Sequence, residues 1–142
     1  MNKIKYIERL PTVNEYISLR KHVNWGTISH TSTEKSLKNS IYSICVEIND
    51  KLIGMGRVIG DGCLCFYIQD IIVHSNYRKI GIATKIMKYI MDYISNTAEE
   101  NSMIGLMAVK GLEPFYQKFG FFIRPFKQYG AGMVQFWKKE IK

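Results

Sequence analysis

Cysteines are scarce in this sequence, and their number and spacing exclude two kinds of protein. The 142 residues include three cysteines, Cys45, Cys63 and Cys65, and this odd number does not fit the disulfide framework of a secreted domain. Cys63 and Cys65 are two residues apart, so in a strand both thiols would point to the same face, which does not suit a zinc pair. We therefore expect buried thiols and no metal site.

Long apolar runs are also missing. No segment approaches the roughly 20 apolar residues of a membrane-spanning helix, and the N-terminal stretch has no apolar core typical of a secretion signal. Apolar residues make up 46% of the chain and charged residues 23%, which are ordinary values for a globular protein. We expect a cytoplasmic protein with a single domain over residues 1–142.

Acidic residues are too few to balance the basic ones. The chain has 20 Lys and Arg against 12 Asp and Glu, a formal net charge of +8. Nucleic acid, an anionic membrane and a polyanionic cosubstrate are all compatible with this excess. Because no five like charges follow one another, the excess is spread, with a focus near Arg78. We expect neither nucleic acid nor membrane as a partner, and no acidic cluster indicates a polyamine or aminoglycoside acceptor.

Periodicity and turn residues predict an alternation of strands and helices. The first helix begins with the capping box Thr12 to Glu15 and ends near Gly26. The same pattern starting at Thr31 predicts a short second helix, whose weak apolar face suits a surface lid better than a core element. Asn49 and Asp50 predict a tight hairpin turn. Strands are predicted over residues 3–10, 41–48, 51–59, 63–73, 103–109, 121–124 and 133–137, with further helices over 81–94 and 113–120.

The residues best suited to bind a ligand lie where the fourth predicted strand meets the long helix. A basic loop with Arg78 and Lys79 leads to Gly81, and helical apolar spacing follows. A helix leaves its first backbone N–H groups without partners, and these attract anions together with the positive end of the helix dipole. Gly81 lets a ligand approach the backbone, while Arg78 can hold phosphate through two donors. The alternative is a basic turn that only caps an ordinary helix.

Two motifs resemble the GNAT superfamily of acyl-CoA-dependent N-acyltransferases. Residues 78–83, Arg-Lys-Ile-Gly-Ile-Ala, fit its Arg/Gln-x-x-Gly-x-Gly/Ala signature, and residues 115–121 resemble its C-terminal Tyr-x-x-x-Gly-Phe segment. The resemblance implies an α/β fold (mixed α+β) in which helices flank a mostly antiparallel central sheet of about seven strands. It also implies that this sheet is splayed and that acetyl-CoA binds where the strands separate. The CoA-binding positions that it implies are Ile72, Val73, Arg78, Lys79, Gly81, Ile82, Ala83 and Thr84.

The resemblance also implies an acid for the reaction. Tyr116 corresponds to the tyrosine that protonates the departing thiolate in the family, and its alternative role is packing among the neighbouring phenylalanines. The base is less defined. Asp70 and Gln69 are polar residues inside an apolar strand and are expected on opposite faces, so that only one can line the site. Asp70 is the chemically sensible candidate, with a paired structural carboxylate as its alternative role, and His74 is a further candidate base.

Three functions compete at this point. The first is an N-acetyltransferase that moves an acetyl group from acetyl-CoA to a primary amine of a small molecule or protein, by direct attack in a ternary complex. The second is a catalytically silent acyl-CoA-binding sensor, and the third is a basic nucleic-acid-binding domain. A dinucleotide-binding fold is excluded because the loop has one glycine, Gly81, where that fingerprint needs three. The exposed edges of a splayed sheet make a homodimer possible.

Overall fold

The computed structural model describes residues 3–139. These residues fall into two units that divide between Met107 and Ala108, and each unit is described by itself. That the whole chain is one domain stays a prediction. Within residues 3–139, no helix is both long and apolar enough to cross a membrane.

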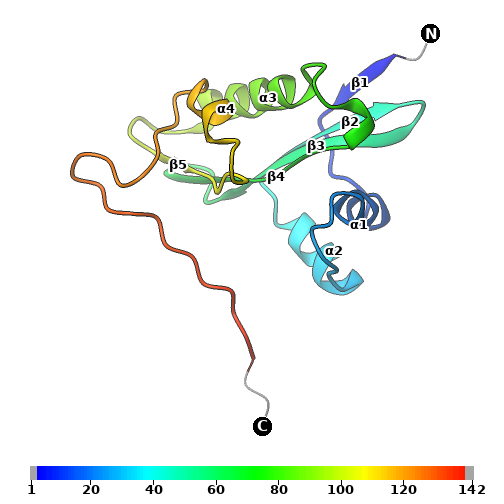
Figure 1. Ribbon diagram of the computed structural model, residues 1–142, viewed down its shortest axis with the longest axis horizontal. Helices are drawn as coiled ribbons and strands as arrows, with labels where there is room; N and C mark the ends of the chain where they lie inside the picture. The colour runs from blue at the N-terminus through cyan, green and yellow to red at the C-terminus, as the bar shows by residue number, and fades with distance from the viewer. Residues whose placement is uncertain (1–2, 140–142) are drawn as a thin grey trace. The chain divides into compact units, whose positions relative to one another are not determined.

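The first unit is built on one five-stranded sheet (Figure 1). Its strands lie side by side in chain order: β1 (Ile4–Ile7), β2 (Tyr42–Ile48), β3 (Lys51–Gly60), β4 (Cys65–Val73) and β5 (Met103–Gly105). The first four strands are antiparallel to their neighbours, and β5 runs parallel to β4. Asn49 and Asp50 join β2 to β3 with φ angles of 50° and 61°, so the predicted tight hairpin turn is confirmed.

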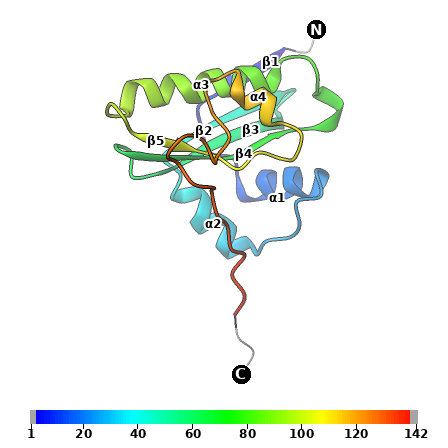
Figure 2. The same ribbon diagram turned by 60° about the vertical axis from the view of Figure 1, so that its left-hand side comes forward.

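Helix α3 (Ile82–Thr97) covers one face of the sheet (Figure 2). It follows β4 after a short 3₁₀ turn (Ser75–Tyr77) and provides the crossover connection that the parallel strands β4 and β5 require. The helical spacing predicted from the sequence is confirmed by its buried side chains, which are Ile82, Ile86, Met87, Ile90 and Ile94. Their burial on one stripe holds the helix against β2, β3 and β4.

Gly56 lets α3 approach the middle of β3. A Cβ at this position would lie 2.6 Å from the side chain of Ile86, 2.8 Å from Ile71 and 2.9 Å from Ile90. We expect Gly56→Ala to lower the free energy of unfolding by about 1–3 kcal/mol, because the added methyl overpacks the interface. Urea denaturation measures the change. Gly105→Ala in β5 is the matched control, since a Cβ there meets nothing within 4 Å; an equal loss in both variants would refute this explanation.

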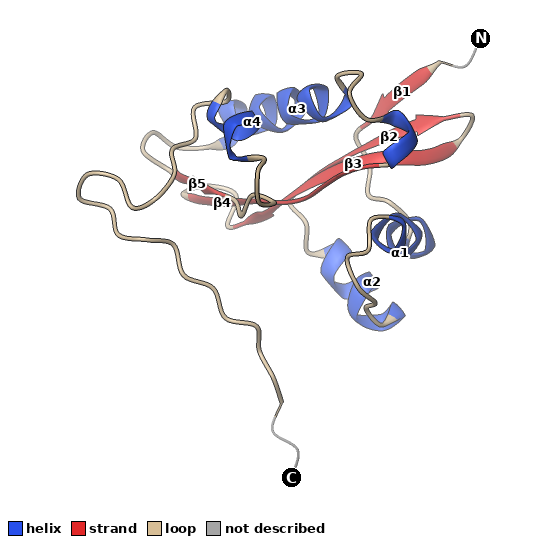
Figure 3. Cartoon of the chain, viewed as in Figure 1, coloured by secondary structure: helices blue, strands red, loops and turns tan. Residues whose placement is uncertain are grey.

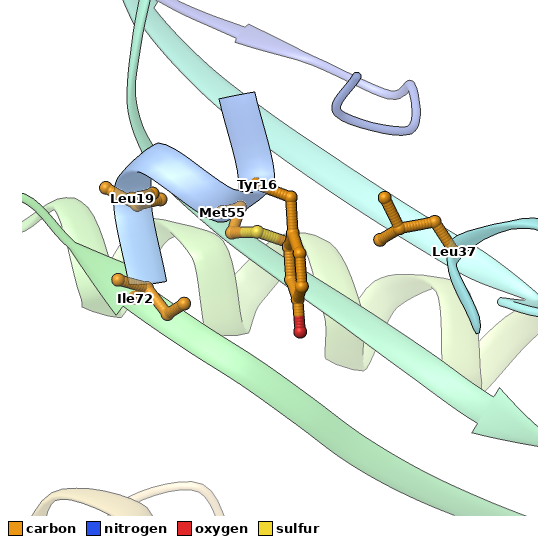
Figure 4. Close-up of a cluster of buried hydrophobic side chains, with 5 residues drawn as sticks. All are labelled: Tyr16, Leu19, Leu37, Met55 and Ile72. Carbon is orange, nitrogen blue, oxygen red and sulfur yellow. The ribbon is translucent and has the colours of Figure 1, made fainter. Parts of the chain in front are cut away.

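Two helices pack on the opposite face of the sheet from α3 (Figure 2). Helix α1 (Val13–His22) begins with the predicted capping box, in which Thr12 and Glu15 each satisfy the other's backbone N–H. Helix α2 (His30–Lys38) is capped by Ser29, so the predicted start at Thr31 was wrong. Both helices bring apolar side chains to the sheet, where a cluster forms from Tyr16, Leu19, Leu37, Met55 and Ile72 (Figure 4).

The prediction of a surface lid for α2 was also wrong. Leu37 and Thr33 are both buried, and Leu37 belongs to the same cluster as Met55 of β3. The hydroxyl of Thr33 donates to the carbonyl of Ser29, which allows a polar residue to be buried without loss of a hydrogen bond. One leucine and one threonine therefore anchor a helix whose remaining residues are largely polar.

The second unit contains fewer elements than the sequence predicts. It holds the short helix α4 (Glu113–Gln117), which has the expected proline in its first turn. The strands predicted over 121–124 and 133–137 are absent from the described residues, and Figure 3 draws this stretch as loop. One isolated backbone bridge joins Phe126 and Tyr129. The mixed α+β fold with a mostly antiparallel sheet is confirmed, with five strands in place of about seven.

The prediction of buried thiols is confirmed for one cysteine and wrong for the other two. Cys45 in β2 is buried, and burial raises the pKa of its thiol to about 12. Cys63 and Cys65 are exposed, because the chain still turns at Cys63 and β4 begins at Cys65. The turn is held by Asp61, whose carboxylate accepts three backbone N–H groups from residues 63–65. These hydrogen bonds also lower the pKa of Asp61.

Candidate functional site

A bulge in β4 determines how its polar residues face. Met55 pairs with Ile72 and Arg57 pairs with Gln69, so two residues of β4 lie opposite Gly56 of β3. The backbone accommodates the extra residue of this bulge at Asp70, whose φ angle of 57° lies in the left-handed region. The prediction that Gln69 and Asp70 point to opposite faces was therefore wrong. The Gln69 amide lies 3.4 Å from the Asp70 carboxylate, and both side chains are on the side of α1 and α2.

Asp70 is the centre of a buried ionic network. The Tyr16 hydroxyl donates to Oδ2 of Asp70 at 2.6 Å, and Nε of Arg57 donates to the same oxygen at 2.7 Å. Arg20 lies 3.7 Å from Oδ1. The Asp70 side chain has 0% exposure, and burial, followed by the neighbouring carboxylate, raises the pKa of Tyr16. Such a carboxylate is held in place by its partners, as a buried charge requires.

The two arginines connect this carboxylate to both helices. Arg57 donates to the carbonyl and hydroxyl of Ser36 and to the hydroxyl of Ser40, at the end of α2. Arg20 of α1 donates to the carbonyl of Trp25 at 2.6 Å, in the loop between the helices. Sequence analysis missed both arginines, although one signal was present. An arginine within the apolar strand Gly54–Gly60 is unusual unless a buried acid pairs with it.

The second half of β4 forms an edge of the described sheet. The parallel pairing with β5 extends only from Cys65 to Tyr67 of β4, opposite Met103 to Gly105. The rest of β4, through Ile72 and Val73, has β3 on one side and no paired strand on the other within the described residues. Backbone groups along this edge are free to bind an extended ligand in the way that a strand would.

The N-terminus of α3 lies just past this edge. Gly81 is its N-cap residue, with a φ angle of 89° and no capping hydrogen bond from a side chain. The first helical hydrogen bond runs from Lys85 N–H to the Gly81 carbonyl, so the N–H groups of residues 82–84 have no partner in the helix. A Cβ at Gly81 would meet nothing within 4 Å, so no neighbouring atom fills the space beside the N-cap residue.

Six of the predicted CoA-binding positions, Arg78, Lys79, Gly81, Ile82, Ala83 and Thr84, lie at or just before this helix terminus, and the other two, Ile72 and Val73, end β4. Arg78, Lys79 and Thr84 are exposed, and Arg78 Nε donates to the carbonyl of Val73 at 3.2 Å, which ties the loop to the end of β4. Ile82 is 2% exposed, so it can offer a ligand its backbone N–H but not its side chain. The arrangement combines free N–H donors, a positive helix end and two cations, which suits a diphosphate.

His74, the further candidate base, lies in a pair of histidines. Its ring stacks on that of His22 with 3.7 Å between centroids, and Nε2 of His22 lies 2.8 Å from the Ser75 hydroxyl. Burial, then the neighbouring His22 and Arg78, lowers the pKa of His74, which favours the neutral ring that a base requires. Nδ1 accepts the N–H of Asn76 at 3.1 Å, so this nitrogen is already engaged.

Tyr116, the predicted acid, belongs to the second unit. Its ring meets Phe115 edge-on at 5.0 Å and Phe121 at 6.4 Å between centroids, both in the same unit. Burial raises the pKa of the Tyr116 hydroxyl above its usual value near 10, so the group carries its proton at neutral pH. The first unit thus contains both Asp70 and the positions of the β4–α3 junction, whereas Tyr116 belongs to the second unit.

Comparisons with known proteins concern the family and the fold of the chain. A family model described as an acetyltransferase (GNAT) domain matches residues 18–135. The chain is similar to a probable acetyltransferase of unknown function from meticillin-resistant Staphylococcus aureus, with 34% identity and a TM-score of 0.86 over 95% of this chain and 100% of that one. No curated protein gives a significant match.

More distant structures share the fold. A GNAT family acetyltransferase from Streptococcus pneumoniae is 23% identical, with a TM-score of 0.76 over 99% of this chain and 100% of that one. An aminoglycoside N-acetyltransferase in complex with CoA is 16% identical, with a TM-score of 0.66 over 99% of this chain and 97% of that one. At these identities the likeness concerns the fold alone.

Proposed function

Since this chain belongs to the GNAT family of acetyltransferases, we propose that it transfers the acetyl group of acetyl-CoA to a primary amine of a small molecule or a protein. The observation that carries the proposal is the terminus of α3, where backbone N–H groups without helical partners follow the uncrowded Gly81 and two exposed cations. This set of donors fits the diphosphate of CoA. The adjacent edge of β4 is suited to bind the extended arm that leads to the thioester.

In the proposed complex each CoA-binding residue has a specific task. Gly81, Ile82, Ala83 and Thr84 offer backbone N–H groups to the diphosphate, and Gly81 keeps the approach open. Arg78 and Lys79 add positive charge. Ile72 and Val73 bind the arm of the cosubstrate through their backbone groups, at the part of β4 that β5 leaves unpaired.

The proposed reaction is a direct attack in a ternary complex. The amine nitrogen forms a bond to the thioester carbonyl carbon, and the carbon–sulfur bond breaks as the tetrahedral intermediate collapses. Tyr116 gives its proton to the departing thiolate, and the proton lost by the amine goes to the base. Once both substrates are held in contact, their orientation supplies much of the rate, because the reaction becomes effectively intramolecular.

Asp70 is the proposed base. Its side chain has no exposed surface, so an amine cannot reach it directly, and the proton would pass through the Tyr16 hydroxyl at 2.6 Å. This route needs Tyr16 to release one proton to Asp70 as it takes another from the amine. His74 is the alternative base, since its lowered pKa favours the neutral ring at neutral pH.

We expect Tyr116→Phe to lower turnover about 100-fold, because general acid catalysis typically contributes 10²–10⁴-fold. Affinity for acetyl-CoA should stay unchanged, and the ring contacts with Phe115 and Phe121 are preserved. Thiol release measures turnover, and calorimetry measures binding. Tyr129→Phe, an exposed tyrosine of the same unit, is the matched control. Undiminished turnover in Tyr116→Phe would leave Tyr116 with a packing role only.

The alternative function, a silent acyl-CoA sensor, is favoured by one observation. Both oxygens of Asp70 are engaged by Tyr16, Arg57 and Arg20, as expected of a structural carboxylate. A panel of primary amines tested for CoA release in the presence of acetyl-CoA separates the two functions. Release with one or more amines supports the transferase, whereas tight binding of acetyl-CoA without release supports the sensor.

A further inference from the structure

Two of the three histidines of the chain are in contact with each other, and both belong to the first unit. His22 is the last residue of α1, and His74 follows the last residue of β4. Their rings stack with 3.7 Å between centroids and 16° between planes, and Nε2 of His22 lies 2.8 Å from the Ser75 hydroxyl. One side chain of α1 therefore contacts two successive residues at the start of the loop that leads to α3.

The His74 side chain also shapes this loop. Its Nδ1 accepts the backbone N–H of Asn76 at 3.1 Å, which caps the 3₁₀ turn Ser75–Tyr77. An accepting Nδ1 carries no proton, so the neutral ring with its proton on Nε2 is the form that makes this hydrogen bond. The turn is followed directly by Arg78, whose Nε donates to the carbonyl of Val73. The cap thus holds the chain just before the residues proposed to bind the diphosphate.

Protonation of His74 works against both contacts of its ring. An imidazolium has N–H donors at both nitrogens, so Nδ1 could no longer accept the N–H of Asn76, and two donors would face each other. The charge would also lie against the stacked ring of His22, where a second positive charge is repelled. The observed arrangement is therefore compatible with a neutral His74 and disfavours a charged one.

The groups around His74 do not compensate for such a charge. The charged groups that face it are His22 of α1 and Arg78 of its own loop. Tyr77 meets the ring edge-on at 5.7 Å between centroids, and β3 contributes the carbonyl of Ile53, which accepts the His74 N–H. Among the described residues, no carboxylate forms an ion pair with either histidine. Burial, followed by His22 and Arg78, lowers the pKa of His74 below its ordinary value of 6.5, so the cap is complete above pH 6.5 and is lost as the pH falls through the lowered value.

We propose that the histidine pair, His22 and His74, acts as a pH-sensitive contact that fixes the loop between β4 and α3 at neutral pH and releases it in mild acid. Release frees the chain from the end of β4 up to Gly81, so acetyl-CoA should bind more weakly. This consequence for binding rests on the proposed function, whereas the release of the loop does not. Direct attraction between charged histidines and the diphosphate would strengthen binding in acid, so the sign of the pH dependence separates the two effects.

Proton NMR of the ligand-free chain tests the release of the loop. We expect His74 to titrate below pH 6.5, and the amide resonance of Asn76 to shift with the same midpoint as its hydrogen bond is lost. His22→Phe keeps a ring at the stacked position without a charge, so the midpoint of His74 should rise. His30→Asn, which changes the third and exposed histidine, is the control and should leave that midpoint in place. A midpoint at or above 6.5, an Asn76 amide that does not follow it, or no effect of His22→Phe would overturn the proposal.

Titration calorimetry with acetyl-CoA tests the consequence for binding. His74→Asn is the decisive variant, because an asparagine side chain accepts a backbone N–H two residues on and takes up no proton. From about pH 7.5 to about pH 5.5, the wild-type affinity should fall about fivefold more than that of His74→Asn, as loss of one cap predicts. The phosphates of acetyl-CoA titrate alike in both series, so the comparison removes their contribution.

The outcomes of the two experiments are distinguishable. The same pH dependence in both proteins, or a wild-type affinity that rises in acid relative to His74→Asn, would overturn the coupling between the histidine pair and the binding of acetyl-CoA. If acetyl-CoA did not bind at any pH, the proposed function would fail, and the NMR titration of His74 and Asn76 would still decide whether the histidine pair holds the loop.

Discussion

Gly81→Asp should weaken acetyl-CoA binding about 100-fold or more. The new carboxylate would lie beside the free N–H groups of α3, where the diphosphate is proposed to bind, and like charges placed together cost several kcal/mol. A cost of 1.4 kcal/mol corresponds to a tenfold change in affinity. The fold should survive, since a Cβ at Gly81 meets nothing within 4 Å and the positive φ of 89° costs about 1–2 kcal/mol. Titration calorimetry with acetyl-CoA measures the effect.

The chain offers a closely matched control for this variant. Gly62 has a φ angle of 77° and nothing within 4 Å of a Cβ, so Gly62→Asp adds the same strain and the same charge. It lies in the turn before β4, next to Cys63, whose carbonyl accepts the Glu99 N–H beyond the opposite end of α3. We expect Gly62→Asp to keep the wild-type affinity. Equal losses in both variants, or no loss in Gly81→Asp, would contradict the placement of the diphosphate.

Asp70→Asn should lower the free energy of unfolding by about 3–5 kcal/mol. Among the described residues, the change removes the only acidic partner of the buried Arg57 and of the partly buried Arg20, and uncompensated buried charges cost this much. The new amide would also present a donor to groups that are donors themselves. Urea denaturation measures the loss as a lower midpoint. Asp92→Asn on the exposed face of α3 is the control, with an expected change within 0.5 kcal/mol.

A second substitution distinguishes lost pairing from general damage. Arg57→Met in the Asp70→Asn background removes one of the unpaired cations, so part of the lost stability should return. Turnover per folded molecule is then measured in the same variants, because it reports on Asp70 as a base independently of its effect on stability. If Asp70→Asn changed stability by less than 1 kcal/mol, the network would not be the buried ionic centre that its distances indicate.

Local patterns in the sequence predict the elements whose causes are local. Helix α3 follows from the spacing of its apolar residues, the start of α1 from its capping box, and the β2–β3 turn from Asn49 and Asp50. In each case the responsible residues lie within a few positions of one another. The free N-terminus of α3 is of the same kind, because Gly81 and its cationic neighbours are adjacent in the chain.

Apart from the start of α2, which Ser29 caps two residues before the predicted Thr31, the main errors concern interactions between residues far apart in sequence. Leu37 is buried because Met55 and Ile72 happen to lie across from it, which its own weakly amphipathic helix does not reveal. The side on which Asp70 faces depends on the pairing between β3 and β4, since one extra residue reverses the alternation of side chains. The strand predicted over residues 133–137 has the right composition, yet a strand exists only when a neighbour pairs with it.

The sequence by itself determined helix α3, the start of α1, the β2–β3 hairpin and the uncapped N-terminus of α3 at Gly81, because hydrogen bonds and apolar spacing within short segments are sufficient to form them. Only the tertiary structure decided that Asp70 is buried between Arg57 and Tyr16, and that β5 leaves half of β4 unpaired. Strand register and charge pairing depend on contacts between distant segments, and the free energy of these contacts appears only when the segments meet.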